Sequence, residues 1–261
     1  MGRIILLKNK TVPSDPYDAL FSEKQHEPVF LPLLKHSSIN QTEVKSFLTS
    51  ETYLREYQAL IVTSQRCIEA LADLVNELRR DGFDRLDSIL NKPSYTVGPT
   101  TYQYLKDLGF NDIRGGKLAG NGSILSDIII KDPLFEQTPK KVLFLTGEIR
   151  KDIIPRKLKA KSFNVLELVS YRTEPLADIG ARYVEATRSP PQNSWLVFFS
   201  PQGTTEIVRI LKQNDHGLQI ASIGPTTEEY LLANGITPAV VSPKPDAASL
   251  AASIAQYEHS L

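Results

Sequence analysis

The sequence predicts an α/β protein made of two similar, doubly wound halves, and three observations support this fold class. Short apolar runs alternate with longer amphipathic stretches along most of the 261 residues, as they do where strands and helices alternate. The apolar runs are rich in Ile, Val and Phe, which indicates parallel strands buried on both faces. The tetrapeptide Gly-Pro-Thr-Thr occurs at Gly98–Thr101 and again at Gly224–Thr227. A duplicated α/β unit accounts for all three.

The individual elements follow from the spacing of the apolar residues. We expect strands at Ile4–Leu7, Ala59–Thr63, Ser94–Val97, Lys141–Thr146, Val165–Tyr171, Leu196–Phe199, Gln219–Ile223 and Ala239–Val241. We expect helices at Gln65–Arg80, Thr100–Leu108, Ser123–Ile130, Arg150–Lys159, Pro201–Gln213, Thr226–Ala233 and Ala247–Tyr257. The proline-containing segment Glu27–His36 and the segment Pro175–Ser194 are expected to connect these elements.

The repeat extends beyond the tetrapeptide. Each copy follows a short apolar strand and opens a helix that ends the same distance on, at Gly109 or Gly235. The strand-and-serine segment Ala59–Ser64 also matches Trp195–Ser200. We therefore infer duplication of a whole strand–turn–helix unit, so that the two halves carry equivalent turns.

Bulk composition excludes several classes of function. Thirty basic and thirty acidic residues cancel, so no global field favours nucleic acid or a membrane surface. Cys67 is the only cysteine, which excludes an internal disulfide and predicts a reducing compartment, the cytoplasm. The apolar run within Gly2–Lys8 is too short for a signal peptide or a membrane span and is expected to be a buried first strand.

The sequence lacks the motifs of metal sites, nucleotide-binding loops and catalytic cysteines. The four histidines lack metal-ligand spacing; they are His26, His36, His216 and His259. No dinucleotide-binding or phosphate-binding glycine loop occurs, and Cys67 falls within an expected helix, where packing is the simpler interpretation. We expect neither a metal nor a cofactor.

The two repeated turns offer hydroxyl groups at helix starts. The first threonine of each copy, Thr100 or Thr226, fits a capping box with the Gln or Glu three residues later. The second, Thr101 or Thr227, would then occupy the first helical position. A hydroxyl there, beside unpaired amides at the positive end of a helix, suits a carboxylate or phosphate. Chance placement is the alternative for this second pair.

Further hydroxyls follow other expected strands. Ser64 and Ser200 each lie at the carboxyl end of a buried strand, where open α/β sheets bind ligands, and Pro201 would make Ser200 a helix cap. Thr146–Gly147 forms a third such turn, with Arg150 shortly after it. Capping explains each residue singly. Together, turns of this kind in both halves predict a cleft for a polyanion.

Several motifs resemble those of one family. The C-terminal third carries Phe198–Gly203, Ala221–Thr227 and Ser242–Pro245, and the first half carries Ile61–Arg66, Val97–Thr101 and Gly147–Leu158. Together they resemble the uroporphyrinogen-III synthase family, in a eukaryotic, fungal form. The resemblance covers nearly the whole chain and is densest in the last third.

The resemblance implies a domain arrangement that periodicity does not. The family has two flavodoxin-like α/β domains joined by a two-stranded connector, with a cleft between them. Carried over, residues 1–28 and 173–261 form one discontinuous domain and residues 42–159 form the other. The connecting strands would lie within 29–41 and 160–172, at Val29–Leu34 and Val165–Arg172.

The resemblance also implies a reaction. The linear tetrapyrrole hydroxymethylbilane is cyclised with loss of water and inversion of ring D, through a spiro intermediate, in haem biosynthesis. Its many carboxylates fit a cleft built from helix amides and hydroxyls. No cofactor is implied. We expect a monomer, with at most transient contact with the preceding enzyme of the pathway.

Individual residues match positions of the family's site. Tyr171 corresponds to a tyrosine proposed to assist loss of hydroxide; a cross-strand aromatic is the alternative interpretation. The residues implied to contact substrate are Thr101, Thr227, Ser64, Ser200, Arg66, Gly98 and Gly147, with Arg150 and Lys8 as carboxylate partners. Among the threonines, Thr101 is the one implied to matter most for activity.

Two other classes of function fit the same turns. A non-catalytic two-domain protein could close around an anionic ligand and would bind a tetrapyrrole without selecting an isomer. An enzyme acting on sugar phosphates or nucleotides could use the same helix ends, although the missing phosphate loops count against it.

Overall fold

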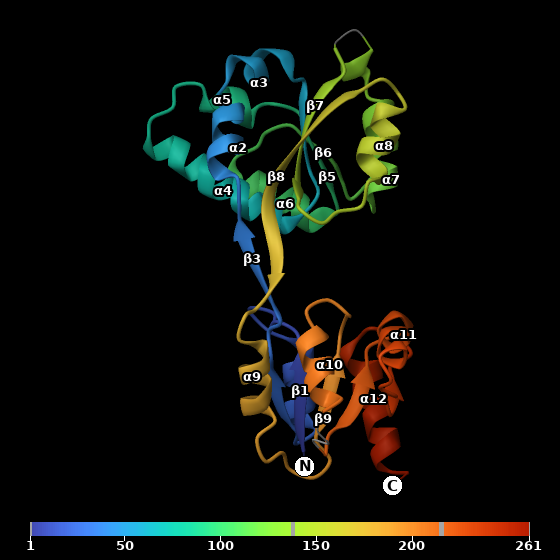
Figure 1. Cartoon of the computed structure of the whole chain (residues 1–261). Helices are drawn as coiled ribbons and strands as arrows, with labels where there is room; N and C mark the ends of the chain where they lie inside the picture. The colour runs from blue at the N-terminus through green and yellow to red at the C-terminus, as the bar shows by residue number, and fades with distance from the viewer. Residues whose placement is uncertain (1, 137–138, 214–216, 261) are drawn as a thin grey trace. The chain divides into compact units, whose positions relative to one another are not determined.

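The computed structural model describes residues 2–136, 139–213 and 217–260 (Figure 1). The chain divides into two units, one formed by residues 1–35 and 174–261 and the other by residues 36–173. Each unit contains one sheet that is predominantly parallel, with helices on both faces. The predicted α/β, doubly wound class is therefore confirmed. No helix within the described ranges is long and apolar enough to cross a bilayer.

The first unit contains a five-stranded parallel sheet in the order β11-β10-β9-β1-β2. Its strands are β1 (Arg3–Leu7), β2 (Glu27–Phe30), β9 (Trp195–Phe198), β10 (Gln219–Ser222) and β11 (Val240–Val241). Its helices are α1 (Pro16–Glu23), α9 (Ile179–Ala186), α10 (Thr205–Leu211), α11 (Pro225–Ala233) and α12 (Ala247–Glu258). Two buried clusters, one with α1 and α12 and one with α9, α10 and α11, cover the two faces.

The second unit contains a six-stranded sheet in the order β3-β8-β7-β4-β5-β6. Its strands are β3 (Leu34–Ser38), β4 (Ala59–Val62), β5 (Ser94–Val97), β6 (Ile113–Gly116), β7 (Lys141–Gly147) and β8 (Asn164–Pro175). Its helices are α2 (Gln41–Leu48), α3 (Glu51–Glu56), α4 (Gln65–Arg80), α5 (Leu86–Leu90), α6 (Pro99–Leu108), α7 (Gly122–Ile130) and α8 (Ile153–Lys159), with a 3₁₀ turn at Pro133–Phe135. Leu60 and Val62 pack into one buried cluster while Ala59 and Ile61 pack into the other, because side chains alternate along a strand.

The two sheets repeat one topology. The order β11-β10-β9-β1-β2 matches β6-β5-β4-β7-β8 strand for strand. In both units a strand–helix alternation leads outward, from β9 through α10, β10, α11 and β11 or from β4 through α4, β5, α6 and β6. The remaining two strands come first in the chain in one unit and last in the other. The duplication inferred from the repeated tetrapeptide is thus visible in the strand order.

Of the two connecting strands, β3 begins later than expected, whereas β8 begins one residue before the expected Val165. Val29 and Phe30 pair with Ile5 and Leu6 inside the first sheet, so they belong to β2, and the connecting strand β3 starts at Leu34. Pro28 concealed this strand, because prolines normally mark loops; β2 tolerates one because it is an edge strand. The segment Pro175–Ser194 likewise contains a helix, α9.

Strand β3 lies along β8 (Figure 1). The backbone N–H of Ile39 donates to the Ser170 carbonyl at 3.0 Å, and the Leu176 N–H donates to the Leu33 carbonyl at 2.9 Å. His36 Nδ1 also lies 2.9 Å from Thr173 Oγ1. These contacts fix the path of β8, which carries Tyr171.

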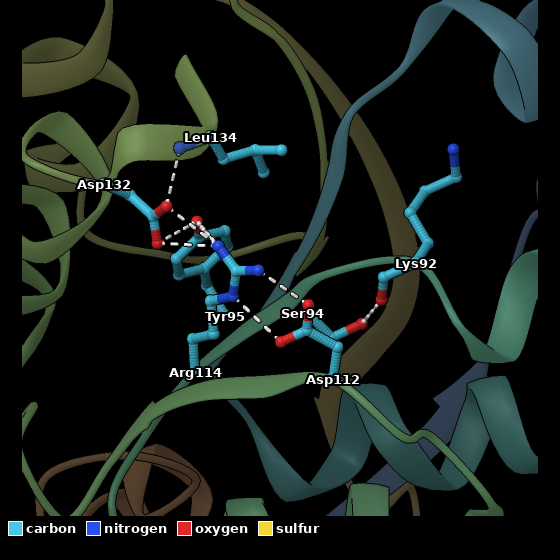
Figure 2. Close-up of polar contacts among 7 residues, drawn as sticks. All are labelled: Lys92, Ser94, Tyr95, Asp112, Arg114, Asp132 and Leu134. Atoms are coloured by element: carbon cyan, nitrogen blue, oxygen red, sulfur yellow. Dashed lines mark hydrogen bonds and ion pairs between the residues drawn. The ribbon is translucent and has the colours of Figure 1, made fainter. Parts of the chain in front are cut away.

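A polar network attaches the edge strand β6 (Figure 2). Arg114 donates to Asp112 at 2.7 Å and to Asp132 at 2.8 Å, and its guanidinium lies 5.8 Å from the centre of the Tyr95 ring. The Tyr95 hydroxyl donates to Asp132 at 2.8 Å. Burial and this bond raise the pKa of Tyr95. The charges of Arg114, Asp112 and Asp132 therefore neutralise one another, and the network stabilises the attachment of β6 to the sheet.

Two helices start later than the sequence suggested. Helix α8 begins at Ile153, so Arg150 lies in the preceding loop. Helix α10 begins at Thr205, because residues 200–204 first form a turn in which Gly203 has φ of +79°. Leu33 and Leu34 pack directly against this glycine. Ser200 is therefore not a helix cap, and the expectation based on Pro201 was wrong.

Candidate active site

A cavity of about 280 Å³ lies at the carboxyl ends of the strands of the second unit. Open α/β sheets bind their ligands at this edge. The lining residues come from the ends of four neighbouring strands, from the loop before α8 and from the first residues of α7 and α8; they are Thr63, Ser64, Val97, Gly122, Phe144, Thr146, Gly147, Ile149, Arg150, Lys151, Ile153, Ile154 and Tyr171. Ser64, Gly147, Arg150 and Tyr171 among the expected site residues are thus brought together.

A β-bulge directs Tyr171. Thr146 pairs with Val169 and Gly147 pairs with Tyr171, so Ser170 is an extra residue in β8. Ser170 is 1% exposed, and its Oγ lies 3.0 Å from Cys67 Sγ on α4. Bulges of this kind turn the next side chain in a new direction. Here that side chain is the phenol that lines the cavity.

The phenol is held by close contacts on two sides. Ser64 Oγ donates a hydrogen bond to Tyr171 Oη at 3.1 Å. A Cβ at Gly147 would lie 2.5 Å from Cζ and 2.7 Å from Oη of Tyr171, so the ring packs directly against the glycine backbone. The alternative of an ordinary cross-strand aromatic does not explain a polar contact at the cavity wall.

Ser64 is the residue before α4, as expected, but its hydroxyl does not cap the helix. Its backbone is extended, and its side chain accepts no hydrogen bond from the first turn. A capping serine would accept one from the second or third helical amide. The hydroxyl is directed to Tyr171 instead, so the capping interpretation is wrong for this serine.

The basic residues differ in what they offer a ligand. Arg150 forms an ion pair with Glu167 of β8, which Lys159 also contacts at 3.3 Å. Arg66 pairs with Glu69 along α4 at 2.8 Å and does not line the cavity. Lys151 lines the cavity, and within the described residues it makes no ion pair. Sequence reasoning missed Lys151, although it follows Arg150 directly.

At the repeated turns the helix caps lie two residues earlier than expected. Gly98 and Gly224 are the N-caps, and the prolines occupy the first helical position, which their fixed φ favours. Each first threonine is consequently exposed, whereas Thr101 is only 9% exposed and Thr227 only 4%. The expected assignment of the first threonine as the helix cap is therefore wrong, and the side chain of the second is largely buried. Thr101 does not line the cavity.

The equivalent edge of the first unit carries Lys8, at the end of β1. Its Nζ bonds Asp15 at 2.5 Å and lies 4.7 Å from the centre of the Tyr17 ring, with Phe30 and Phe199 slightly farther away. Burial would raise the pKa of Asp15, but the bonds from Lys8 and two backbone amides lower it to about 2. The charge of Lys8 is thus largely neutralised within the fold. Ser200 and Thr227 follow β9 and β10 of the same sheet.

Metal and thiol chemistry find no support in the described part of the chain. No group of three or more His, Cys, Asp or Glu side chains there could hold a metal ion, and His216 lies outside the described residues. Cys67 is 0% exposed, and burial raises its pKa to about 12. A thiol in this state is not a nucleophile.

The fold and this edge define a class: a duplicated α/β protein with hydroxyls, helix ends and a phenol where parallel strands end. A family model described as uroporphyrinogen-III synthase HemD matches residues 15–252. The chain belongs to the uroporphyrinogen-III synthase family, as the sequence motifs predicted.

Curated relatives agree over the full length. The chain is 42% identical to uroporphyrinogen-III synthase of Saccharomyces cerevisiae, covering 98% of this chain and 96% of that protein. It is 36% identical to the protein of the same name from Schizosaccharomyces pombe, covering 99% and 98%.

Solved structures share the fold. The uroporphyrinogen-III synthetase of Helicobacter pylori has a TM-score of 0.58 at 18% identity, covering 100% of this chain and 99% of that one. A mutant uroporphyrinogen III synthase of Thermus thermophilus has a TM-score of 0.53 at 15% identity, covering 100% of both chains.

Proposed function

We propose that this chain converts hydroxymethylbilane into uroporphyrinogen III, closing the ring with loss of water and inverting ring D. It is then a cyclising lyase of haem biosynthesis. Membership of the family along residues 15–252 supports this function. The structural observation that carries the proposal is the Tyr171 phenol, which lines a cavity at the carboxyl edge of a parallel sheet.

In the proposed mechanism Tyr171 is the general acid. The carbon–oxygen bond of the hydroxymethyl group breaks as the phenol gives its proton to the departing oxygen, so that water and an azafulvenium-like cation form. Ring D attacks this cation through its already substituted carbon and gives the spiro intermediate. One bond of the spiro carbon then breaks, and the ring recloses in the inverted sense. The proton released on rearomatisation returns to the phenolate, and the balance is one water lost.

The rest of the site holds the substrate in the conformation that leads to inversion. Hydroxymethylbilane closes without inversion when nothing guides it, so orientation is the main contribution expected of the protein. The first-turn amides of α4, which no side chain caps, are suited to substrate carboxylates. We propose Lys151 and Arg150 as the cationic partners at this edge, because both line the cavity.

The remaining expected contacts stay predictions. Gly98 and Gly147 would approach substrate through their backbones, and Arg66 would need to leave Glu69 to do so. For Thr101 and Thr227 we propose a supporting role beneath the first turn of each helix, because their side chains are buried. Lys8 and Ser200 are the proposed substrate contacts of the first unit. That the substrate lies in a cleft between the units also stays a prediction.

We further propose that the protein works as a monomer in the cytoplasm, with transient contact with the preceding enzyme of the pathway. The single, buried Cys67 supports a reducing compartment. Light scattering of the purified protein checks the first point: a mass near 29.1 kDa is expected, and a concentration-independent dimer would contradict it.

One assay separates the enzyme from a non-catalytic binding protein. Freshly prepared hydroxymethylbilane is supplied to the protein, the products are oxidised to porphyrins, and the type III and type I isomers are separated. We expect type III to predominate with protein and type I in a protein-free blank. Binding of the tetrapyrrole with the isomer ratio of the blank would establish the alternative function.

A further inference from the structure

Ser64 has a hydroxyl that its own helix does not use. It precedes a helix of 16 residues, where a serine side chain usually caps, yet it makes no cap bond. Its Oγ lies 3.1 Å from Oη of Tyr171 and donates to it, although the two residues are 107 positions apart in the sequence. Both residues line the same cavity. The Ser64 hydroxyl therefore contacts the phenol of Tyr171 and not the amides of its own helix.

We propose that Ser64 is a positioning residue that sets the direction of the Tyr171 proton. A phenol oxygen carries one proton and accepts through its lone pairs. In the proposed arrangement Ser64 donates to that oxygen at 3.1 Å, so that the phenol proton points to another acceptor, which the leaving hydroxyl of a bound substrate supplies. The same bond from Ser64 stabilises the phenolate that remains after proton transfer. This inference rests on the proposed role of Tyr171 as the general acid. It makes Ser64 a hydrogen-bond partner of that acid, whereas the family resemblance implied a substrate contact.

The surroundings of the pair leave the phenol little freedom to adopt another direction. Gly147 lies against the ring, where any side chain would collide with Cζ and Oη. The bulge at Ser170, anchored beside Cys67 of α4, places the next residue of β8 opposite Gly147. Ser64 begins the same helix that holds Cys67. One helix thus fixes both the strand that carries the phenol and the hydroxyl that orients it.

The duplicated unit provides an internal comparison. Val62 pairs with Leu145, and Phe198 pairs with Leu7, so Ser64 and Ser200 occupy equivalent places two residues beyond equivalent strand ends. The strand equivalent to β8 is β2, and the residues from Glu27 to Leu34 contain no tyrosine. Within the described residues Ser200 makes no side-chain hydrogen bond. Of these two serines only Ser64 contacts a phenol; the hydroxyl–phenol bond of the first unit joins Thr204, the N-cap of α10, to Tyr230 of α11 at 3.2 Å.

The test uses Ser64→Ala, Ser64→Thr and Ser200→Ala, with a spectroscopic measurement and a kinetic one. In protein labelled with ¹³Cζ-tyrosine, the Tyr171 resonance is assigned by its loss in Tyr171→Phe. Without substrate, this resonance should shift in Ser64→Ala, stay close to its original position in Ser64→Thr, and remain unchanged in Ser200→Ala. Ser64→Gly, which keeps a good N-cap backbone, repeats the comparison should Ser64→Ala fail to fold.

With hydroxymethylbilane, Ser64→Ala should lower kcat about tenfold, equivalent to about 1.4 kcal/mol, and leave KM within about twofold. Ser64→Thr should recover most of kcat. A raised KM with unchanged kcat would instead make Ser64 a substrate contact and overturn the proposal, as would an unmoved Tyr171 resonance in Ser64→Ala. A wild-type protein that forms no type III product would contradict the proposed function, whereas the resonance tests the Ser64 contact independently.

Discussion

The two units of the molecule share a topology but differ at the edge where their strands end. Five strands of each sheet follow the same order, and both units present a serine and a Gly-Pro-Thr-Thr turn at this edge. In the second unit the edge carries a hydroxyl–phenol pair beside a cavity. In the first unit it carries Lys8, whose charge is neutralised by Asp15 and surrounded by aromatic rings. The first unit also has a hydroxyl–phenol bond, from Thr204 to Tyr230, but it joins two helices. Duplication therefore supplied helix ends twice, whereas the acid proposed for catalysis comes from strand β8 of the second unit.

The source of the difference is one strand. Strand β8 extends to Pro175, past its last pairing with β7 at Tyr171, and contains the bulge that places Tyr171 against Gly147. Its counterpart β2 is four residues long, and the chain then continues through Leu31 and Leu33, which are buried in the core. The same position in the two sheets thus serves packing in one unit and the proposed chemistry in the other.

Removing the phenol should have the largest effect. Tyr171→Phe should lower kcat by about 10²-fold if the phenol is a general acid, with little change in stability. Tyr95→Phe is the matched control. Tyr95 lies in the same sheet and does not line the cavity, and the substitution removes a phenol hydroxyl that is hydrogen-bonded to Asp132. Steady-state kinetics of both variants decide the matter. A loss below tenfold in correctly folded Tyr171→Phe would reduce Tyr171 to a positioning residue.

The edge of the first unit should instead respond to acid. The folded-state pKa of Asp15 is about 2, below its ordinary value of 3.8, so the carboxylate stabilises the fold above about pH 4. This contribution, about 2 kcal/mol, is lost as the pH falls from about 4 towards 2. Urea denaturation between pH 7 and pH 2 should show a shallower decline in unfolding free energy for Asp15→Asn than for wild type. Parallel profiles would show that the Lys8–Asp15 pair does not stabilise this edge.

A glycine substitution tests how closely the phenol is held. Gly147→Ala should lower kcat roughly tenfold, about 1.4 kcal/mol of transition-state stabilisation, because its Cβ would lie 2.5 Å from Tyr171 Cζ. In Gly120→Ala the new Cβ would meet no atom within 4 Å, so kcat should stay unchanged. Equal kinetics for the two variants would mean that the ring can move aside without consequence.

Part of this comparison could be predicted from the sequence. The residue ranges of α4 and β5 match the structure because each has a clear apolar period between strong boundaries. The repeated tetrapeptide predicted the shared topology. The family resemblance, and not the apolar period, singled out Tyr171.

Other features depended on contacts that no local pattern contains. The helices at the repeats start at their prolines, and the capping-box pattern of the threonines concealed this. Ser64 and Tyr171 meet only because β4 and β8 lie on either side of β7. The bulge at Ser170 and the neutralisation of Lys8 by Asp15 likewise arise from tertiary pairing. The contacts of these hydroxyl and charged groups therefore depend on which strands are neighbours in the sheet, and a local sequence pattern does not contain that information.

The central claim is that the acid and the surface that orients the substrate are separate parts of this protein. The isomer composition of the product formed by Tyr171→Phe tests it most directly, after subtraction of a protein-free blank. We predict slow formation of product that is still predominantly type III, because loss of the phenol leaves the helix ends and the fold intact. Type I product at the rate of the blank would contradict this account, as would type III product at the wild-type rate.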